Sequence, residues 1–323
     1  MESREAWSAI PVQPRAGIAA DERRSCLMSS PGSGRRMVSA YINPPSGEVI
    51  RRWCSEQFHD SRTAHRQSTI TTSAGPTHVL ALGDTHEPGP VVVVVPGTNM
   101  NTAALLPFLA ELATRYRVIA VDIPGQPGLS APQRPTRDRT DWYGRWLDEV
   151  LEQTVPDTAV LLGHSLGGAI ALACSSPRVG GQVLIAPAGL VRLAVPPRLL
   201  VATLAWLAAP SRDHTSSLLQ AMTGPARTVA PHLVDWMTLV ARYCRSTLAP
   251  APLNPGVLER CRSAPCVVAT GSHDIFLPPR RLEPAVHDLL GTELRVLPSC
   301  GHLALDDDPA GVVELVDDLT GRL

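Results

Sequence analysis

A run of five valines, Val91–Val95, places the strongest constraint on the fold of this chain. β-Branched residues favour strands, and a strand without polar residues must be covered on both of its faces. Such coverage is typical of inner strands in a parallel sheet that lies between two layers of helices. The run therefore predicts an α/β protein with a parallel sheet.

The segments around the valine run alternate between strand and helix patterns. Apolar, β-branched runs predict further strands at 117–123, 159–163, 182–188, 266–272 and 293–298. Helical periodicity predicts helices from about 47, over 102–116 and 141–154, after Ser165, near 280–290, and from about Pro309. Two Thr- and Val-rich runs before the valines predict antiparallel strands at 66–75 and 77–84. The alternation predicts a mostly parallel sheet with helices on both faces.

Two stretches do not fit this alternation. Residues 1–45 are rich in Arg, Ser, Pro and Gly without a sustained period, which predicts a disordered leader. Residues 189–255 contain apolar helical stretches broken by Pro and Gly, and they predict a helical cap inserted into the sheet domain. An ordinary helical subdomain without a ligand is the alternative. The α/β core is then 46–188 and 256–323.

The charge balance and the cysteines limit the kinds of partner and ligand to be expected. The 323 residues include 29 basic residues, all Arg, and 30 acidic ones, so the formal net charge is -1. This balance gives no reason to expect a nucleic acid or a membrane as partner. The seven cysteines lack zinc-ligand spacing, so we expect no metal and reduced thiols in a cytoplasmic protein. We expect no signal peptide, because the first 26 residues contain no continuous apolar core of the required length, and no membrane span, because no apolar run of about 18 residues occurs later.

The sharpest motif is Gly163-His164-Ser165-Leu166-Gly167-Gly168, directly after an apolar run. A nucleophilic Ser at the end of a buried strand must turn sharply into a helix so that its hydroxyl stands clear of the sheet. Side chains two residues either side of the Ser would collide in such a turn, and glycines remove those collisions. The motif predicts Ser165 as a nucleophile, with a plain Gly-rich turn as the alternative.

With this motif between a strand and a small-residue helix, the chain resembles the α/β-hydrolase superfamily, of the esterase and thioesterase type, from about residue 64 onward. The family's chain order is nucleophile, acid, histidine. The resemblance implies Asp274 as the acid, in GSHDIFLPP, and His302 as the base, in PSCGHLALDDDP. Helix capping is the alternative role for Asp274. His164 is expected to pack, and the three acids at 306–308 are expected to begin a helix rather than to hold a metal.

The resemblance also implies an oxyanion hole made by two backbone amides, those of Leu166 and Thr98. Family members commonly carry His where this chain has Pro96; Gly97 still permits the turn, and the amide of Thr98 is the expected donor. Asn99 and Asn101 could add side-chain donors or cap the following helix. Asp122 is expected to be structural. In the cap, Trp206, Met222 and Trp236 are expected to bind substrate together with Asn99, with helical core as the alternative.

These residues predict a serine hydrolase that cleaves ester, thioester or lactone bonds of a small, hydrophobic substrate through an acyl-enzyme on Ser165. No cofactor is expected. One alternative is an acyltransferase or cyclase of small-molecule biosynthesis that uses the same triad. Another is a ligand-binding protein without activity on the same scaffold. A small molecule is the expected partner, and the oligomeric state is left open.

Overall fold

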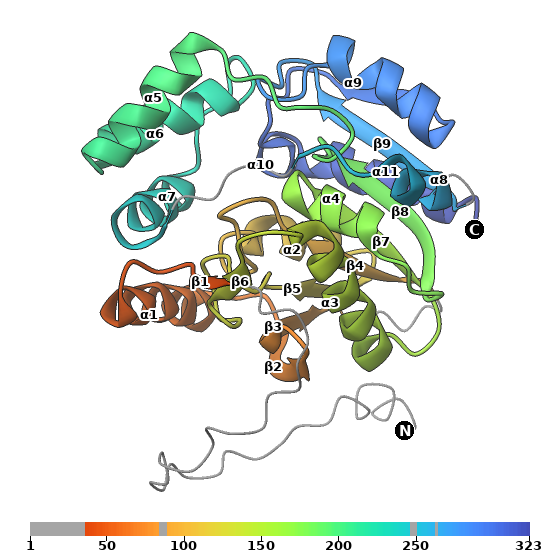
Figure 1. The fold of residues 1–323 in the computed structure, drawn as a ribbon, viewed down its shortest axis with the longest axis horizontal. Helices are drawn as coiled ribbons and strands as arrows, with labels where there is room; N and C mark the ends of the chain where they lie inside the picture. The colour runs from red at the N-terminus through yellow and green to blue at the C-terminus, as the bar shows by residue number, and fades with distance from the viewer. Residues whose placement is uncertain (1–35, 84–88, 246–250, 262–263) are drawn as a thin grey trace, which may run out of the picture.

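An eight-stranded sheet with the order β10-β9-β8-β7-β4-β5-β3-β2 runs through the centre of the computed structural model (Figure 1). The structure describes residues 36–83, 89–245, 251–261 and 264–323. The strands of this sheet are β2 (His65–Thr72), β3 (Gly75–Leu82), β4 (Val91–Val95), β5 (Arg117–Val121), β7 (Ala159–His164), β8 (Val179–Ile185), β9 (Cys266–Gly271) and β10 (Leu294–Leu297). All neighbouring pairs are parallel except β2 with β3 and β3 with β5. The mostly parallel sheet expected from the sequence is confirmed.

The valine run forms β4, and all five of its side chains are buried. β4 lies between β5 and β7, near the middle of the sheet. Val92 and Val94 contribute to one hydrophobic core, while Val91, Val93 and Val95 contribute to the other. Burial on both faces explains why the strand carries no polar residue.

Two layers of helices cover the sheet. One core packs beneath α1 (Pro44–Asp60), α2 (Leu106–Leu112), α10 (Ala304–Asp307) and α11 (Pro309–Thr320). The other packs beneath α3 (Arg139–Thr154), α4 (Leu166–Ala173), α8 (Pro255–Cys261), α9 (Pro279–Ala285) and the π-helical turn η1 (Val286–Leu290). No helix in the described ranges is both long and apolar enough to cross a membrane.

For two of the predicted elements the difference in bounds has a clear local cause. β8 ends at Ile185 rather than at 188, because Ala186 adopts a φ of 44° and Pro187 has no N–H to continue the ladder. α2 begins at Leu106 rather than at 102, with Pro107 in its first turn. The preceding residues form a hydrogen-bonded turn in which the amide of Leu105 donates to the carbonyl of Asn101.

The expected disordered leader is wrong for residues 36–45. Strand β1 (Met37–Ser39) pairs with β6 (Gln133–Pro135), and α1 begins at Pro44. The side chain of Asn43 caps that helix by accepting from the amide of Ser46 at 3.0 Å. Residues 1–35 lie outside the described residues.

The described part of residues 189–254 forms the helices α5 (Pro197–Ala208), α6 (Arg212–Met222) and α7 (Pro231–Tyr243), on the left of Figure 1. Here they are called the cap helices. α5 packs against α6 and α7, and α7 also packs against α1 of the core. An isolated bridge between Tyr41 and Cys244 joins the end of α7 to the segment before α1.

Candidate active site

Ser165 occupies a strained turn between β7 and α4. Its φ of 52° and ψ of -111° are rarely adopted by a residue with a side chain. The amide of Ser165 donates to the carbonyl of Ile185 at 3.0 Å, and the Ser165 carbonyl accepts from Ala188 at 3.0 Å. β8 therefore holds the turn in place from one side.

Two glycines make this turn possible, as the motif predicted. A Cβ at Gly163 would lie 2.6 Å from the carbonyl oxygen of Gly167. A Cβ at Gly167 would lie 2.0 Å from the carbonyl oxygen of Val95, at the end of β4. Both obstacles are backbone atoms and cannot rotate away, so the turn fits against β4 only with glycines at these positions.

The three residues predicted as a triad form one hydrogen-bonded line. His302 Nε2 lies 3.1 Å from Ser165 Oγ, and His302 Nδ1 lies 2.8 Å from Asp274 Oδ2. All three side chains are buried. Asp274 follows β9 and His302 follows β10, so the carboxyl ends of parallel strands bring them to the edge where Ser165 follows β7.

Asp274 is held as a carboxylate. Burial alone would raise its pKa, but the charge and hydrogen bond of His302 outweigh burial and hold the pKa below its ordinary value. The amides of Leu277 and Phe276 each donate to Asp274 Oδ1 at 2.8 Å. Thr270 Oγ1 donates to the other oxygen at 3.1 Å. These donors fix the carboxylate toward the imidazole. The alternative role, a helix cap, is limited to the two loop amides, because α9 has no side-chain cap.

His164 lies beside His302 rather than serving as packing alone. Burial, followed by the charge of His302, lowers its pKa to about 4, so its ring is neutral at pH 7. His164 Nε2 lies 2.8 Å from the carbonyl oxygen of His302, so this nitrogen carries the proton and donates it. The backbone of the His302 loop is thus tied to the residue next to Ser165.

The loop after β4 lies against the Ser165 turn. A Cβ on Gly97 would be 3.5 Å from Ser165 Cβ and 2.9 Å from His164 Nδ1. Leu166 is the first residue of α4, and Thr98 is the residue after Gly97. The two amides predicted as oxyanion donors are therefore on segments that meet beside the Ser165 side chain.

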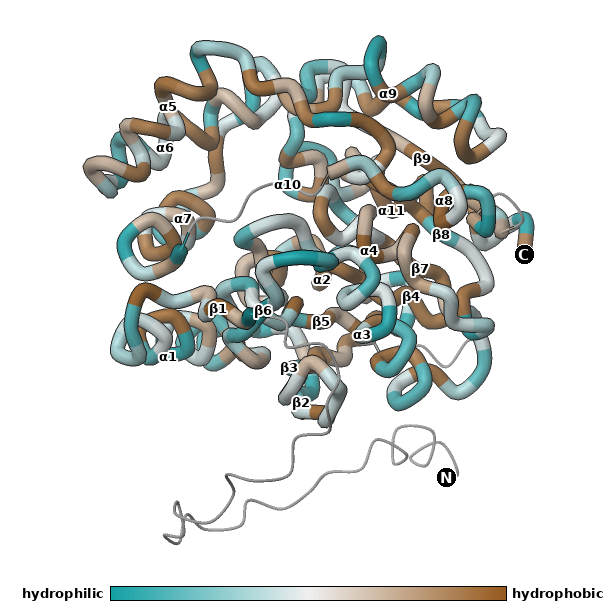
Figure 2. Tube along the Cα trace, in the orientation of Figure 1, coloured by the Kyte–Doolittle hydropathy of each residue, from teal (hydrophilic) through white to brown (hydrophobic). Residues whose placement is uncertain are grey.

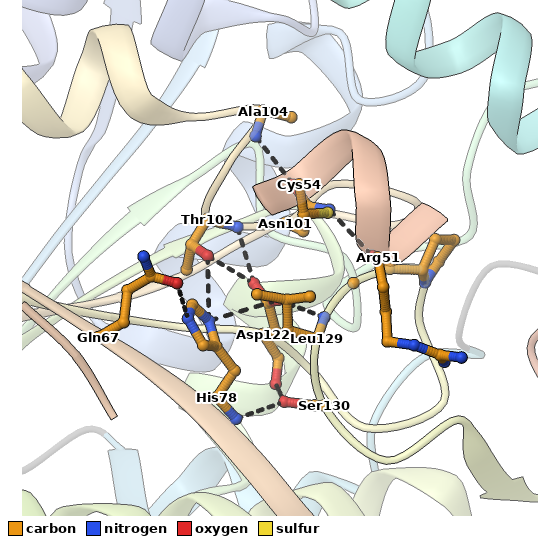
Figure 3. Close-up of polar contacts among 12 residues, drawn as sticks. Arg51, Cys54, Gln67, His78, Asn101, Thr102, Ala104, Asp122, Leu129 and Ser130 are labelled. Atoms are coloured by element: carbon orange, nitrogen blue, oxygen red, sulfur yellow. Dashed lines mark hydrogen bonds and ion pairs between the residues drawn. The ribbon is translucent and has the colours of Figure 1, made fainter. Parts of the chain in front are cut away.

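A buried polar cluster around Asp122 holds Thr102, near the end of this loop (Figure 3). The amide and the hydroxyl of Thr102 both donate to Asp122 Oδ1 at 2.8 Å, and the amide of Leu129 donates to Oδ2 at 2.7 Å. His78 Nδ1 lies 3.5 Å from the same carboxylate. Burial would raise the pKa of Asp122, yet His78 and the amide donors keep it below its ordinary value. Asp122 is structural, as expected.

The two asparagines of the loop have different roles. Asn101 Oδ1 accepts from the amide of Ala104 at 2.8 Å, so the side chain caps the turn before α2. Asn99 adopts a φ of 63°, and its carbonyl accepts from the indole of Trp236 at 2.7 Å. Trp236 is fully buried and packs against Trp53, with the ring centroids 4.7 Å apart and the planes tilted by 33°. The Trp236 side chain therefore supports the loop that follows β4. Contact of Asn99 and Trp236 with substrate stays a prediction.

The other two cap residues also have defined contacts. Trp206 is buried, and its indole donates to the carbonyl of Met237 within the cap helices. The carbonyl of Met222 accepts from the amide of His302 at 2.6 Å, so Met222 lies beside the His302 loop. Contact between substrate and the side chains of Trp206 and Met222 stays a prediction.

A carboxylate missed in the sequence joins the cap to the His302 loop. Asp307 Oδ2 accepts from the amide of Gly301 at 2.7 Å and from the amide of Gly224 at 2.8 Å. Asp308 is the residue that caps α11, by accepting from Gly311. One acid suffices for such a cap. The presence of three acids in a row was therefore the sequence signal that one of them, here Asp307, has a role other than capping.

No group of three or more His, Cys, Asp or Glu side chains within the described ranges is placed to hold a metal ion. The chemistry available at the site is that of an oxygen nucleophile with an adjacent base and two nearby backbone amides.

Comparison with known proteins agrees with this geometry. Residues 92–315 match the model of the alpha/beta hydrolase family. Two Bacillus subtilis proteins are similar in part, and the chain spans a third to a half of their length. "Uncharacterized carboxylesterase nap" is 35% identical over 99 residues, 31% of this chain and 32% of that protein. Carboxylesterase YbfK is 31% identical over 159 residues, 48% of each.

Among solved structures, naproxen esterase from Bacillus subtilis superposes with a TM-score of 0.71 at 21% identity, covering 85% of this chain and 98% of that one. At this identity the likeness shows the fold. The chain belongs to the alpha/beta hydrolase family, and its fold is the α/β-hydrolase fold.

We expect Gly167→Ala to destabilise the protein by about 3 kcal/mol or more, because the new methyl would overlap the carbonyl of Val95. Gly180→Ala is the matched control, since the nearest atom to its Cβ is a Thr158 side-chain carbon at 3.4 Å. Urea unfolding of both variants measures the difference. Equal stability of the two variants contradicts the packing described for the turn.

The raised pKa of Asp306 predicts that the stability of the protein depends on pH. Burial and the neighbouring Asp307 raise its pKa to about 7. An unfolded chain loses this proton near pH 4, at a pKa of about 3.9. The folded state thus holds an extra proton between about pH 4 and about pH 7, and the free energy of unfolding falls as pH rises through that window.

We therefore expect Asp306→Asn to gain a few degrees in Tm relative to the wild type as the pH is raised from about 5 to about 8. Asp318→Asn, at an exposed position of α11, is the control and keeps the wild-type profile. Parallel profiles for the wild type and Asp306→Asn count against the raised pKa.

Proposed function

We propose that this chain is a serine hydrolase that cleaves carboxylic ester bonds of a small, mainly apolar substrate through an acyl-enzyme on Ser165. The observation that carries the proposal is the buried line from Asp274 through His302 to Ser165, with 2.8 Å and 3.1 Å between successive heteroatoms. These distances lie within the range for a nucleophile, its base and the group that orients the base. The names of the two similar Bacillus subtilis proteins, both carboxylesterases, add support.

The proposed reaction has two steps. His302 Nε2 takes the Ser165 proton while Oγ bonds to the ester carbonyl carbon, and the tetrahedral intermediate loses the alcohol, to which His302 returns the proton. Water then repeats the sequence on the acyl-enzyme and releases the acid. Asp274 holds the imidazole in the tautomer with its proton on Nδ1 and stabilises the charged ring.

The amides of Leu166 and Thr98 are the proposed donors to the oxyanion. They belong to the two segments that meet at Ser165, and no hydrogen bond among the described residues engages either amide. Thioester and lactone carbonyls present the same electrophile to this machinery, so they fall within the proposed substrate class. The cap helices, bonded to the His302 loop through Met222, are the proposed source of acyl selectivity.

Labelling with a fluorophosphonate tests the assignment of the nucleophile. We expect one label per chain in the wild type and none in Ser165→Ala, which should keep the wild-type Tm because a single hydroxyl contributes little packing. Ser175→Ala, at a serine outside the site whose hydroxyl bonds Asp148, is the matched control and should label fully. Label on Ser165→Ala contradicts the proposal, and an unlabelled wild type favours a binding protein.

A chain-length panel of chromogenic esters tests the substrate class. Each buried methylene contributes about 0.8 kcal/mol, so kcat/KM should rise roughly fourfold per methylene until the pocket is full. Thioesters of the same acyl groups should follow the same order. A flat profile contradicts an apolar acyl pocket, and acyl transfer to added alcohols faster than to water favours an acyltransferase.

The role of Asp274 is tested by Asp274→Asn. The amide leaves His302 without its carboxylate and favours the wrong tautomer, so kcat should fall by about 10⁴-fold. Asp288→Asn, at an exposed position of η1, is the control and should keep wild-type kcat. Near-normal kcat in Asp274→Asn places the acid elsewhere.

A further inference from the structure

Exposed hydrophobic side chains are concentrated on one helix of the cap. Of the nine large hydrophobic residues exposed in the described part of the chain, five lie between 195 and 207. They are called the apolar ridge below and comprise Val195, Leu200, Val201, Leu204 and Leu207. Their exposed fractions range from 38% to 67%. Brown segments recur along α5, which lies at the outer edge of the molecule (Figure 2).

Four of the five ridge residues lie on one side of α5, and Val195 comes just before the helix. Leu200, Val201, Leu204 and Leu207 follow the spacing that places residues on one helical face. The opposite side of the helix carries Leu199 and Trp206, which are buried against the rest of the cap. Packing within the chain therefore uses one side of α5 and leaves an equally apolar side in contact with water. Exposed apolar side chains on an ordinary surface are scattered singly, whereas these are grouped on one element.

Along the chain, the segment that carries the ridge holds basic charges only. No Asp or Glu occurs from residue 158 to residue 212, and the next acid, Asp213, is in α6. Arg192 and Arg198, on either side of Val195, are both exposed. An apolar helical face with flanking arginines complements a surface that is apolar inside and negatively charged outside. The whole-chain charge hides this local imbalance.

The size of the ridge argues against a second copy of the chain as its occupant. A helix of 12 residues is about 18 Å long and about 10 Å wide, a footprint near 200 Å². A stable protein interface needs about 800 Å² from each partner. A lipid surface has no such requirement, because it takes up a single apolar face to a shallow depth.

We propose that the apolar ridge of α5 docks on an anionic lipid surface, with Arg192 and Arg198 at the level of the headgroups. The helix lies in the plane of the interface and does not enter the hydrocarbon as a span. This departs from the expectation, based on net charge, that no membrane is a partner. The proposal does not depend on the proposed ester hydrolysis, because its test measures binding and not turnover.

Co-sedimentation of the full chain with vesicles tests the proposal. One set of vesicles is phosphatidylcholine, and the other is an equal mixture of phosphatidylcholine and phosphatidylglycerol. We expect the wild type to bind the mixed vesicles more tightly, and added salt to weaken that binding. Leu204→Gln should lower the partition coefficient about tenfold, and Arg198→Gln about fivefold.

Val296→Ser is the matched control, because Val296 is 47% exposed, against 56% for Leu204, but lies in β10, far from the ridge in sequence. It should bind as the wild type does. Circular dichroism and Tm verify that every variant is folded. The proposal is overturned if the wild type binds neither kind of vesicle, or if Leu204→Gln binds as well as the wild type. A dimer in light scattering that Leu204→Gln converts to a monomer, without vesicle binding, would identify a second copy as the occupant instead.

Discussion

The contact between Gly167 and the end of β4 is the constraint on which the site depends. Because Gly167 has no side chain, the turn at Ser165 can approach the carbonyl of Val95. This approach brings the loop after β7 and the loop after β4 together beside the Ser165 side chain. One loop carries the serine with its strained backbone, and the other carries Gly97 and Thr98. The strain at Ser165 is sustained because β4 and β8 fix the turn from both sides.

Much of the fold and the positions of Ser165, Asp274 and His302 could be predicted from the sequence, for one physical reason. Each of the three follows a strand whose apolar pattern is local and readable, and parallel strands end at the same edge of a sheet. The valine run needed no long-range information to be identified as buried on both faces. The chain order of the family that the sequence resembles then paired the residues, although the distances between them came only from the structure.

The features that could not be predicted rest on backbone contacts between distant segments. His164 bonds a carbonyl 138 residues away, and Asp307 bonds the amide of Gly224, 83 residues away. Residue type does not encode such partners, so the sequence predicts only packing for His164 and a helix start for Asp307. The strand at 37–39 was missed for the same reason, since its Pro- and Ser-rich surroundings resemble a linker and its partner is β6.

The bond of Asp307 to both Gly224 and Gly301 has a consequence for how such proteins can be recombined. Chain position makes the cap helices look like an interchangeable module between two halves of a core. Yet the His302 loop takes part of its shape from the cap through Met222 and Gly224, and the carboxylate that completes the joint comes from the core. A chimera that exchanged only 189–255 would inherit a histidine loop fitted to another cap. The natural unit of exchange is therefore the cap together with the 299–308 loop, two pieces of chain that sequence alone would separate.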